Sequence, residues 1–565
     1  MHGVVGQSLW QKLKEKFWQK TGCGLVVSLF LIGLSLTGCQ FPQTLPPSKG
    51  NAPPKAEVKL PSAKRLPSDT LMLALNTEPP SLDPMKISDA VSGTVMQQLM
   101  RGLTKFDDEG KVVPAVASHW KVDNQGKRYT FYLRKDARWS DGQPVTAQQF
   151  YDGWLRVLDK NSGAPYSFFF FPIVNAQAYF QGTLNDATKV GIRVLNTHTL
   201  QVDLVRPLVF FPSMIAYHMG LPIRKELIER HGDRFTEGGT LVSNGPYTLK
   251  TWRHDERLVL EPNPYYWQQR PNRPKLQFRI IPDAGTSVML FENGELDVIE
   301  SGSGISAFEF RRFATHPWAK QVGTQSIYYL GFNTKKPPFH HAGVRRAFCQ
   351  ALQKQWIPQL LQAGQTPLHS FVTPDLLGYD AALGLRYDAQ AAKQAWKAAK
   401  VPAQQVQDIQ IGVRNTYDSK RIGEIVRYQW QQTLGVPVRL KLADWKVYLN
   451  ELERDPPHIF FLSWLSDYPD ADSFLGLFTS NNGNNHTQWK HPRYDALVEE
   501  AQRITDPAKR KVLYKEVQQL AFEQEACACP LYQLNKLYVK QPRVQGLHYN
   551  PLNQLQLDAV SLVKP

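Results

Sequence analysis

Three aspartates lie within six positions of the stretch SWLSDYPDADSF, which runs from Ser463 to Phe474. Asp467, Asp470 and Asp472 could hold a metal ion, act as an acid and a base, or receive a positively charged ligand. Hydrolytic carboxylates must stand at a fixed separation around the scissile bond, and nothing nearby supplies a nucleophile or an apolar pocket. An EF-hand loop needs alternating ligands, a central glycine and a terminal glutamate, a pattern that this stretch lacks. We therefore expect Asp470 and Asp472 to be solvated loop residues, or to cap the segment Ser473–Phe478.

Asp467 differs from the other two acids in what precedes it. The apolar run Ile459–Leu462 predicts a buried strand, which would bring Trp464 and Asp467 to its end, where ligands tend to bind. A carboxylate partly withdrawn from water needs a cation to offset its desolvation. Asp467 is thus a candidate receptor for a positive charge; the alternative is an aspartate satisfied by local backbone amides.

Catalytic and cofactor motifs are lacking elsewhere in the chain. The sequence contains no G-x-S-x-G, H-E-x-x-H or P-loop pattern. His340 and His341 are adjacent, so their side chains diverge and do not suggest a shared metal. We predict no enzyme, no cofactor and no metal site. An exported hydrolase that uses Asp467, Asp470 and Asp472 stays as an alternative.

The charge of the chain is strongly positive but scattered. The 565 residues carry a formal charge of +16, with 42% hydrophobic and 21% charged residues, as in a folded globular protein. Clustered Lys and Arg would point to nucleic acid. The tightest cluster, Lys509–Lys511, lies on a helix-like run and is interpreted as a solvated face, so no nucleic-acid partner is predicted.

The first 67 residues resemble an export and anchoring segment. Four lysines precede the apolar run Gly24–Leu36, and Leu36-Thr37-Gly38-Cys39 resembles a bacterial lipobox, in which the cysteine is lipidated. We expect residues 1–38 to be a lipoprotein signal peptide and Cys39 to be the lipidated residue; the alternative is an uncleaved anchor. The Pro-rich segment 39–67 is interpreted as an extended tether, or as a disordered remnant.

Three cysteines remain in the body of the chain: Cys349, Cys527 and Cys529. Three thiols in an exported protein do not form a disulfide framework. We expect buried thiols, or a single bridge from Cys349.

The body mixes strands and helices. The chain is expected to form a strand from Leu71, a helix over Val91–Leu103 and a strand over Tyr129–Leu133. Thr146 and Gln149 form a capping box that predicts the start of a further helix. The fold class is therefore α/β or α+β, and no internal repeat is present.

Several motifs follow one another in a characteristic order: PSLDP, VVPAVASHW, RWSDGQPVTAQQF, NGPYTLKTW, LEPNPYYW and LGFNTKKPPF. With them, the chain from about Leu71 to its C-terminus resembles the bacterial extracellular solute-binding proteins of family 5, the receptors of peptide and nickel ABC importers. The resemblance implies an α/β, periplasmic-binding-protein-like fold (type II, cluster C), with two lobes joined by hinge strands and an extra inserted domain. It implies a split domain I over 68–101, 223–325 and 531–565, an inserted domain II over 102–222, and a domain III over 326–530.

The resemblance also implies a ligand site. In oligopeptide-binding members, an Asp three residues after a Trp receives the α-ammonium group of the peptide, and Asp467 occupies that position after Trp464. Ser463 and Leu465 flank this tryptophan and are expected to contact the ligand as well. Some members carry an Arg three residues before the Trp that anchors the ligand carboxylate. Phe461 stands there in this chain, and Arg454 is the candidate replacement.

A second part of the implied site comes from the segment GAPYSFFFF. Tyr166 matches the place where a Tyr of the inserted domain reaches toward the ligand. The run Phe168–Phe171 is interpreted as core packing, with an apolar pocket wall as the alternative.

Taken together, the resemblance implies a lipid-anchored, monomeric receptor without enzymatic activity. It would capture short peptides between two lobes and deliver them to the permease subunits of an ABC transporter. The alternative within the same class is a non-peptide solute, such as a nickel chelate, haem or an oligosaccharide, because fold alone does not specify a ligand.

Overall fold

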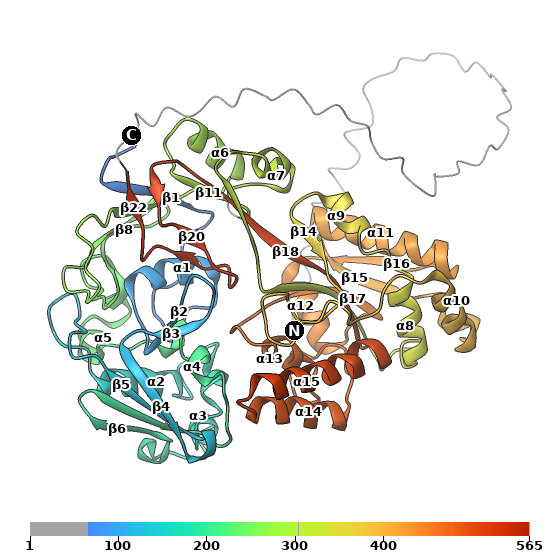
Figure 1. Cartoon of the computed structure of the whole chain (residues 1–565), viewed down its shortest axis with the longest axis horizontal. Helices are drawn as coiled ribbons and strands as arrows, with labels where there is room; N and C mark the ends of the chain where they lie inside the picture. Colours follow the sequence, from blue (N-terminus) through green and yellow to red (C-terminus); the bar gives the residue numbers. More distant parts are fainter. Residues whose placement is uncertain (1–65, 303, 564–565) are drawn as a thin grey trace, which may run out of the picture. The chain divides into compact units, whose positions relative to one another are not determined.

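The computed structural model describes residues 66–302 and 304–563 (Figure 1). The predicted signal peptide, Cys39 and the tether up to residue 65 lie outside the described residues. Within the described part of the chain, no helix has the length and apolarity needed to cross a membrane.

The first sheet has four strands in the order β1-β10-β9-β8. β1 pairs with β10 in parallel, and the other neighbours are antiparallel. These strands are β1 (Thr70–Leu75), β8 (Tyr247–Arg253), β9 (Arg257–Pro262) and β10 (Lys275–Ile280). β1 is the strand that the apolar sequence from Leu71 predicted.

Helix α1 (Ala90–Leu99) begins at Asp89, whose carboxylate accepts the Ser92 amide at 2.8 Å. The helix is shorter than the predicted Val91–Leu103. The reason is a tertiary contact: the backbone N–H and C=O of Arg101 both bond the Asn244 side-chain amide, at 2.9 Å each. These two bonds hold the chain out of helical geometry just after α1.

The second sheet is antiparallel, in the order β4-β5-β7-β6. Its strands are β4 (Ala117–Asp123), β5 (Arg128–Leu133), β6 (Ile192–Asn196) and β7 (Thr199–Asp203). Helix α2 (Ala147–Val157) contacts β6 and β7 and buries Phe150 and Trp154 completely. The predicted capping box of Thr146 and Gln149 is present at its start.

The third sheet has eight strands, with a main path β11-β18-β13-β17-β15-β16 and with β12 and β14 paired to β18. The strands are β11 (Val298–Glu300), β12 (Ala319–Gly323), β13 (Ser326–Phe332), β14 (Gln365–Pro367), β15 (Gln410–Arg414), β16 (Arg439–Ala443), β17 (Ile459–Leu465) and β18 (Ala528–Lys540).

Two segments connect the strands β11 and β12 with the strands β13 and β14, and these two pairs of strands belong to different groups of elements. The 13-residue β18 pairs with β13 and β14 near its start and with β11 and β12 near its end, and Figure 1 shows it running between the two groups. The second crossing is Thr324–Gln325, which joins β12 directly to β13. Two crossings of this kind are what two lobes joined by hinge strands require. The predicted domain boundaries stay a prediction.

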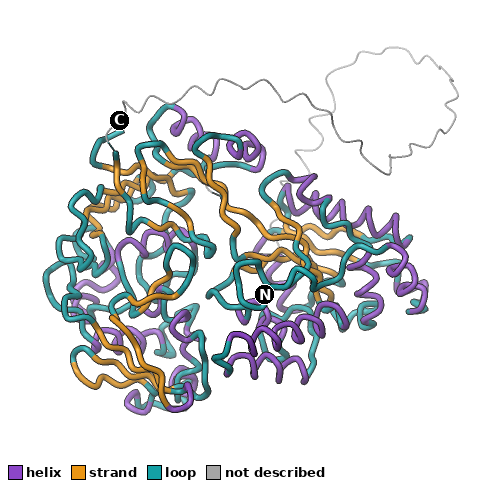
Figure 2. The backbone as a smooth tube through the Cα atoms, in the orientation of Figure 1, coloured by secondary structure: helices purple, strands orange, loops and turns teal. Residues whose placement is uncertain are grey.

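Further helices complete the described part of the chain; Figure 2 shows them beside the strands. They are α3 (Ala176–Phe180), α4 (Phe211–Met214), α5 (Lys225–His231), α6 (Ala284–Glu292), α7 (Ala307–Ala314), α8 (Ala342–Gln350), α9 (Trp356–Leu361), α10 (Ala389–Ala398), α11 (Tyr417–Leu434), α12 (Trp445–Arg454), α13 (Asp472–Leu475), α14 (Pro492–Arg503) and α15 (Pro507–Gln518). Short strands are β2 (Thr104–Phe106), β3 (Val112–Pro114), β19 (Val544–Gln545), β20 (His548–Tyr549), β21 (Leu555–Gln556) and β22 (Ser561–Leu562).

β17 is buried on both faces, which explains its unbroken apolar sequence. Phe460 and Leu462 belong to one hydrophobic core, whereas Ile459 and Phe461 belong to another. The run of buried residues ends at Leu462, and Ser463 is the first exposed residue of the strand.

The burial of side chains tests two expectations from the sequence, one about the cysteines and one about the basic cluster. Cys349, Cys527 and Cys529 are buried free thiols, so the bridge from Cys349 is not formed. Lys509–Lys511 does lie on a helix, α15, but its middle residue is not solvated: Arg510 is buried. The basic cluster is therefore two exposed lysines around a buried arginine.

Candidate functional site

Two adjoining cavities lie at the end of β17. The first has a volume of about 300 Å³ and is lined by Asp467, Tyr166, Tyr217 and His218, among others. The second has a volume of about 660 Å³ and is lined by Ser463 and Trp464, among others. The two are adjacent, because they share five wall residues, and together they are called the cleft: Ala90, Thr94, Leu465, Asn553 and Leu555.

The topology explains why the cleft opens here. β15 runs parallel to both β16 and β17, so the carboxyl ends of all three strands lie at one edge of the sheet. Ligands of α/β proteins bind at such edges. The residues after the buried part of β17 therefore line the cleft, as the sequence predicted for Trp464 and Asp467.

Asp467 is held by its backbone, while its carboxylate has no partner. Its amide donates to Ser473 Oγ at 2.9 Å. Among the described residues, no hydrogen bond or ion pair reaches the carboxylate oxygens, so local backbone amides do not satisfy this group. Burial raises the pKa of Asp467 to about 7. The site thus holds a desolvated carboxylate in need of a counter-charge.

Tyr166 lies in the same cavity as Asp467, although 301 positions separate them. Its pKa is raised by burial and, secondarily, by the charges of Asp467 and Asp89. The Tyr166 ring packs at 6.2 Å from Tyr217 and at 5.6 Å from His218, centroid to centroid. Aromatic rings thus form one wall of the cavity that holds the carboxylate.

His218 is neutral at physiological pH. Burial lowers its pKa to about 4, and its Nε2 lies 2.7 Å from the Ile87 carbonyl oxygen. In the neutral ring, Nε2–H donates this bond and Nδ1 stays available as an acceptor. His218 therefore brings no positive charge to Asp467. The sequence analysis missed Tyr217 and His218. The signal that could have found them is an adjacent Tyr-His pair within the apolar run before Leu221.

The phenylalanine run contributes packing. Phe169 and Phe170 are buried in the core, and Phe168 is 50% exposed. None of the four side chains of Phe168–Phe171 lines either cavity. The packing interpretation is confirmed for Phe169 and Phe170 but not for Phe168.

Asp470 is not the solvated loop residue that the sequence suggested. It is buried, and both its carboxylate oxygens accept Arg510 Nη2 at 2.8 Å. It also accepts the Tyr514 hydroxyl at 2.7 Å. Its carboxylate also accepts the Asp472 amide at 3.0 Å, but the N-cap residue of α13 is Ala471, so neither aspartate is the predicted N-cap.

Asp472 is also buried, against expectation. Its carboxylate accepts the Tyr468 hydroxyl at 2.8 Å and Gln502 Nε2 at 2.9 Å, and burial raises its pKa to about 6. The distant partners of Asp470 and Asp472 come from α14 and α15, which fold back over the loop. The two aspartates thus fix the loop that carries Asp467.

Trp464 and its neighbours occupy the second cavity. The Trp464 indole Nε1 is buried without a hydrogen-bond partner among the described residues. A buried indole N–H normally finds an acceptor, so this donor is available to a ligand. Ser463 pairs with Tyr328 of β13 in the sheet register, and Leu465 pairs with Ser326.

Arg454 is not brought to the site. It is exposed at the end of α12, before β17 begins, and lines neither cavity. The four buried residues Ile459–Leu462 of β17 lie between it and the cleft, a span of about 13 Å at ~3.3 Å per residue. Phe461, where some relatives have an Arg, is buried against Tyr328 at 6.0 Å between ring centroids. The structure gives no support to a contact of Arg454 with the ligand carboxylate, which stays a prediction.

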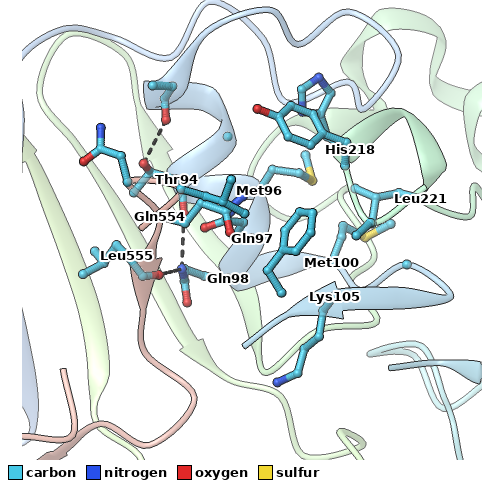
Figure 3. Close-up of a pocket in the computed structure, with 18 of the residues that line it drawn as sticks. Thr94, Met96, Gln97, Gln98, Met100, Lys105, His218, Leu221, Gln554 and Leu555 are labelled. Atoms are coloured by element: carbon cyan, nitrogen blue, oxygen red, sulfur yellow. Dashed lines mark hydrogen bonds between the residues drawn. The ribbon is translucent and has the colours of Figure 1, made fainter. Parts of the chain in front are cut away.

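The C-terminal segment forms part of the wall of the first cavity. In Figure 3, Gln98 of α1 donates to the Leu555 carbonyl, at 3.3 Å, and Met96, Met100 and Leu221 lie around the same space. No group of three potential metal ligands occurs among the described residues. The cleft is thus partly apolar, with a few polar groups and one unpaired acid at the end of β17.

Comparisons with known proteins identify the family of this chain. Residues 111–486 match the family described as "Bacterial extracellular solute-binding proteins, family 5 Middle". The chain is 30% identical over 548 residues to the oligopeptide-binding protein OppA of Bacillus subtilis strain 168, covering 92% of this chain and 96% of the relative. It is 29% identical over 487 residues to the probable deoxycholate-binding periplasmic protein YgiS of Escherichia coli K12, covering 84% of this chain and 90% of the relative.

A solved structure supports the same assignment. The crystal structure of Haemophilus influenzae OppA in complex with RPPGFSPFR aligns with a TM-score of 0.72 and 25% identity, covering 88% of this chain and 99% of that structure. The expected α/β, periplasmic-binding-protein-like architecture of type II is confirmed by this alignment and by the three sheets described above. The chain belongs to the bacterial extracellular solute-binding proteins of family 5.

Proposed function

We propose that this chain is an exported receptor that captures short peptides in the cleft at the end of β17 and delivers them to an ABC transporter permease. The observation that carries the proposal is the half-buried carboxylate of Asp467, three residues after Trp464, which has no partner among the described residues. A peptide α-ammonium offsets one such charge, and the contact strengthens as water leaves the cleft.

The second cavity supports the rest of the peptide. Its volume of about 660 Å³ holds several residues beyond the first. Trp464 Nε1 offers a donor for a peptide carbonyl, and main-chain pairing with strand edges gives affinity without a demand on sequence. Closure of the two lobes about β18 and Thr324–Gln325 would then bury the ligand and present a liganded surface to the permease.

The anchoring step is part of the same proposal. A lipid on Cys39 and the Pro-rich segment 39–67 would hold the receptor near the membrane that contains its permease. The receptor acts as a monomer and performs no chemistry on its ligand.

Binding measurements on the chain without its leader test the proposal. Calorimetry with a tripeptide and with its N-acetylated form should show a loss of at least about tenfold in affinity on acetylation, because the ammonium is removed. Equal affinities would refute the role of Asp467. Mass spectrometry of molecules that co-purify should detect a mixture of short peptides.

A non-peptide solute is the second candidate, because a relative of nearly equal identity is named as probably deoxycholate-binding. Deoxycholate is an anion, and a cavity that holds the unpaired Asp467 opposes a carboxylate. Competition between a tripeptide and deoxycholate in the same calorimetric cell separates the two candidates. The second is favoured only if the bile acid binds and the peptide does not.

A further inference from the structure

The charged residues that line the cleft are not balanced. In the first cavity, two bases and three acids line the wall: Arg101, Lys105, Asp89, Asp467 and Asp558. In the second cavity, one base and two acids line the described part of the wall: Lys536, Glu300 and Asp418. Acids are therefore in excess in both cavities, although the whole chain carries a formal charge of +16.

The bases of the first cavity are already paired. Arg101 Nη2 and Lys105 Nζ each contact one carboxylate oxygen of Asp558. Burial opposes the ionised form of Asp558, but Arg101 and Lys105 outweigh it and hold the pKa of this carboxyl below its usual range. Arg101 and Lys105 thus share the one carboxylate of Asp558, and among the described residues neither base forms an ion pair with Asp89 or Asp467.

Asp89 shares the cavity with Asp467 and also lacks an ion pair. Its Oδ1 caps α1 through the Ser92 amide, and no Lys or Arg of the described residues lies within ion-pair distance of the carboxylate. The charges of Asp89 and Asp467 both act on Tyr166, which lies in the same cavity. A ligand group placed beside Tyr166 thus meets two carboxylates.

The base of the second cavity is paired as well. Lys536 Nζ contacts Glu300 Oε2 and lies 4.7 Å above the Tyr549 ring. Asp418, in the first turn of α11, has no ion pair among the described residues, and burial raises its pKa even though Arg421 opposes this. Arg421 itself lies over the Tyr417 ring at 5.2 Å.

We infer that the cleft selects cationic peptides, in which Asp467 receives the α-ammonium, Asp89 a Lys or Arg side chain of the first residue, and Asp418 a basic side chain further along. This inference rests on the proposed function and names the ligand class of the same site. The physical reason is that closing the cleft removes water from three carboxylates. Positive charge on the ligand offsets that desolvation, and the protein's own bases in the cleft form ion pairs with Asp558 and Glu300 instead.

Peptides that differ in the charge of a single side chain test the inference. The protein used is the full chain after removal of its leader. Calorimetry compares Lys-Ala-Ala, Gln-Ala-Ala and Glu-Ala-Ala, and then Ala-Ala-Lys, Ala-Ala-Gln and Ala-Ala-Glu. The Lys peptides should bind about tenfold more tightly than the Gln peptides, and the Glu peptides should bind least tightly. The preference should shrink at high salt, since partly exposed charge pairs are screened.

Two variants locate the preference. Asp89→Asn should reduce the affinity of Lys-Ala-Ala to that of Gln-Ala-Ala, and Asp418→Asn should reduce the affinity of Ala-Ala-Lys to that of Ala-Ala-Gln. Unchanged circular dichroism spectra and thermal unfolding midpoints show that each variant is folded. Asp123→Asn removes the same charge from an exposed position outside both cavities and should leave every affinity unchanged.

The outcomes separate the inference from the function beneath it. Equal affinity for Lys, Gln and Glu peptides, with N-acetylation still harmful, overturns the charge preference and leaves peptide capture intact. An effect of Asp123→Asn as large as that of Asp89→Asn also overturns it, because the preference would then reflect net charge. No binding of any peptide overturns the proposed function itself.

Discussion

The ring of Tyr468 stacks on the ring of Phe210, with centroids 4.7 Å apart and planes inclined by 11°. Tyr468 follows Asp467 directly, and Phe210 immediately precedes α4. The stack therefore joins the loop after β17 to the segment that leads to Tyr217 and His218. It helps to set Asp467 against the aromatic wall of the first cavity.

Loss of this stack should weaken both ligand binding and stability. Phe210→Leu keeps an apolar side chain but removes the ring pair, which contributes about 0.5 to 1.5 kcal/mol beyond area burial. We expect peptide affinity to fall severalfold and the free energy of unfolding to fall by about 1 to 2 kcal/mol. Calorimetry and urea unfolding measure the two, with Phe168→Leu at a half-exposed position as the control. Unchanged affinity would show that the stack does not position Asp467.

Peptide affinity should depend on pH through Asp467. Its carboxyl has a pKa of about 7 in the free protein, so below pH 7 a proton competes with the ligand ammonium. The dissociation constant should rise by up to about tenfold for each pH unit below 7. Titrations between pH 5 and pH 8 measure the slope, and Asp467→Asn should show weak, pH-independent binding. A flat profile for the unmodified protein would contradict this assignment.

Asp467 should also make the free protein less stable as the pH rises. An aspartate of the unfolded chain ionises near pH ~4, whereas the folded protein keeps this proton until about pH 7. The contribution of Asp467 to the free energy of unfolding therefore falls between these values. Asp467→Asn should be more stable than the unmodified protein at pH 8, by about 1 to 3 kcal/mol because the side chain keeps some contact with water. Urea unfolding at pH 4 and pH 8 should show the difference only at pH 8.

The buried pair of Asp470 and Arg510 should be essential for stability. Asp470→Asn leaves the Arg510 guanidinium buried with less than its full counter-charge, at an expected loss of about 3 to 5 kcal/mol. Lys509→Met, one position away on the exposed side of α15, should change stability by less than about 0.5 kcal/mol. Denaturant unfolding compares the two. A small effect of Asp470→Asn would mean that Tyr514 and Asp472 hold the loop without the ion pair.

Cys39 should decide whether the protein stays with membranes. Cys39→Ala removes the thiol that a lipid would modify, so the protein should move from the membrane fraction to the soluble exported fraction. Cys23→Ala, within the same leader, should leave the distribution unchanged. Fractionation with immunodetection, and mass spectrometry of the N-terminal peptide, measure both. Membrane retention of the Cys39 variant would contradict lipid anchoring at this residue.

Local patterns in the sequence were sufficient where the interaction itself is local. The capping box of Thr146 and Gln149 is visible in the sequence because its partners lie three residues apart. The strand is visible as the apolar run Ile459–Leu462 because both of its faces are buried. The end of that strand also identified Asp467 and Trp464, since a buried strand brings the residues after it to an edge of the sheet. Helix α1 ends earlier than its sequence suggests, because the distant Asn244 bonds Arg101.

Only the tertiary structure decided the roles of the other acids and bases. Asp470 and Asp472 looked like solvated loop residues, yet helices 30 to 44 positions downstream bring Gln502, Arg510 and Tyr514 to them. Tyr217 and His218 reach the site of Asp467 through folding alone, and Arg454, 13 positions from Asp467 in sequence, is kept away by the length of β17. The sequence by itself determined the family and the central carboxylate. Which charges near it are paired depends on distances across the fold, and those distances leave no periodic pattern in the chain.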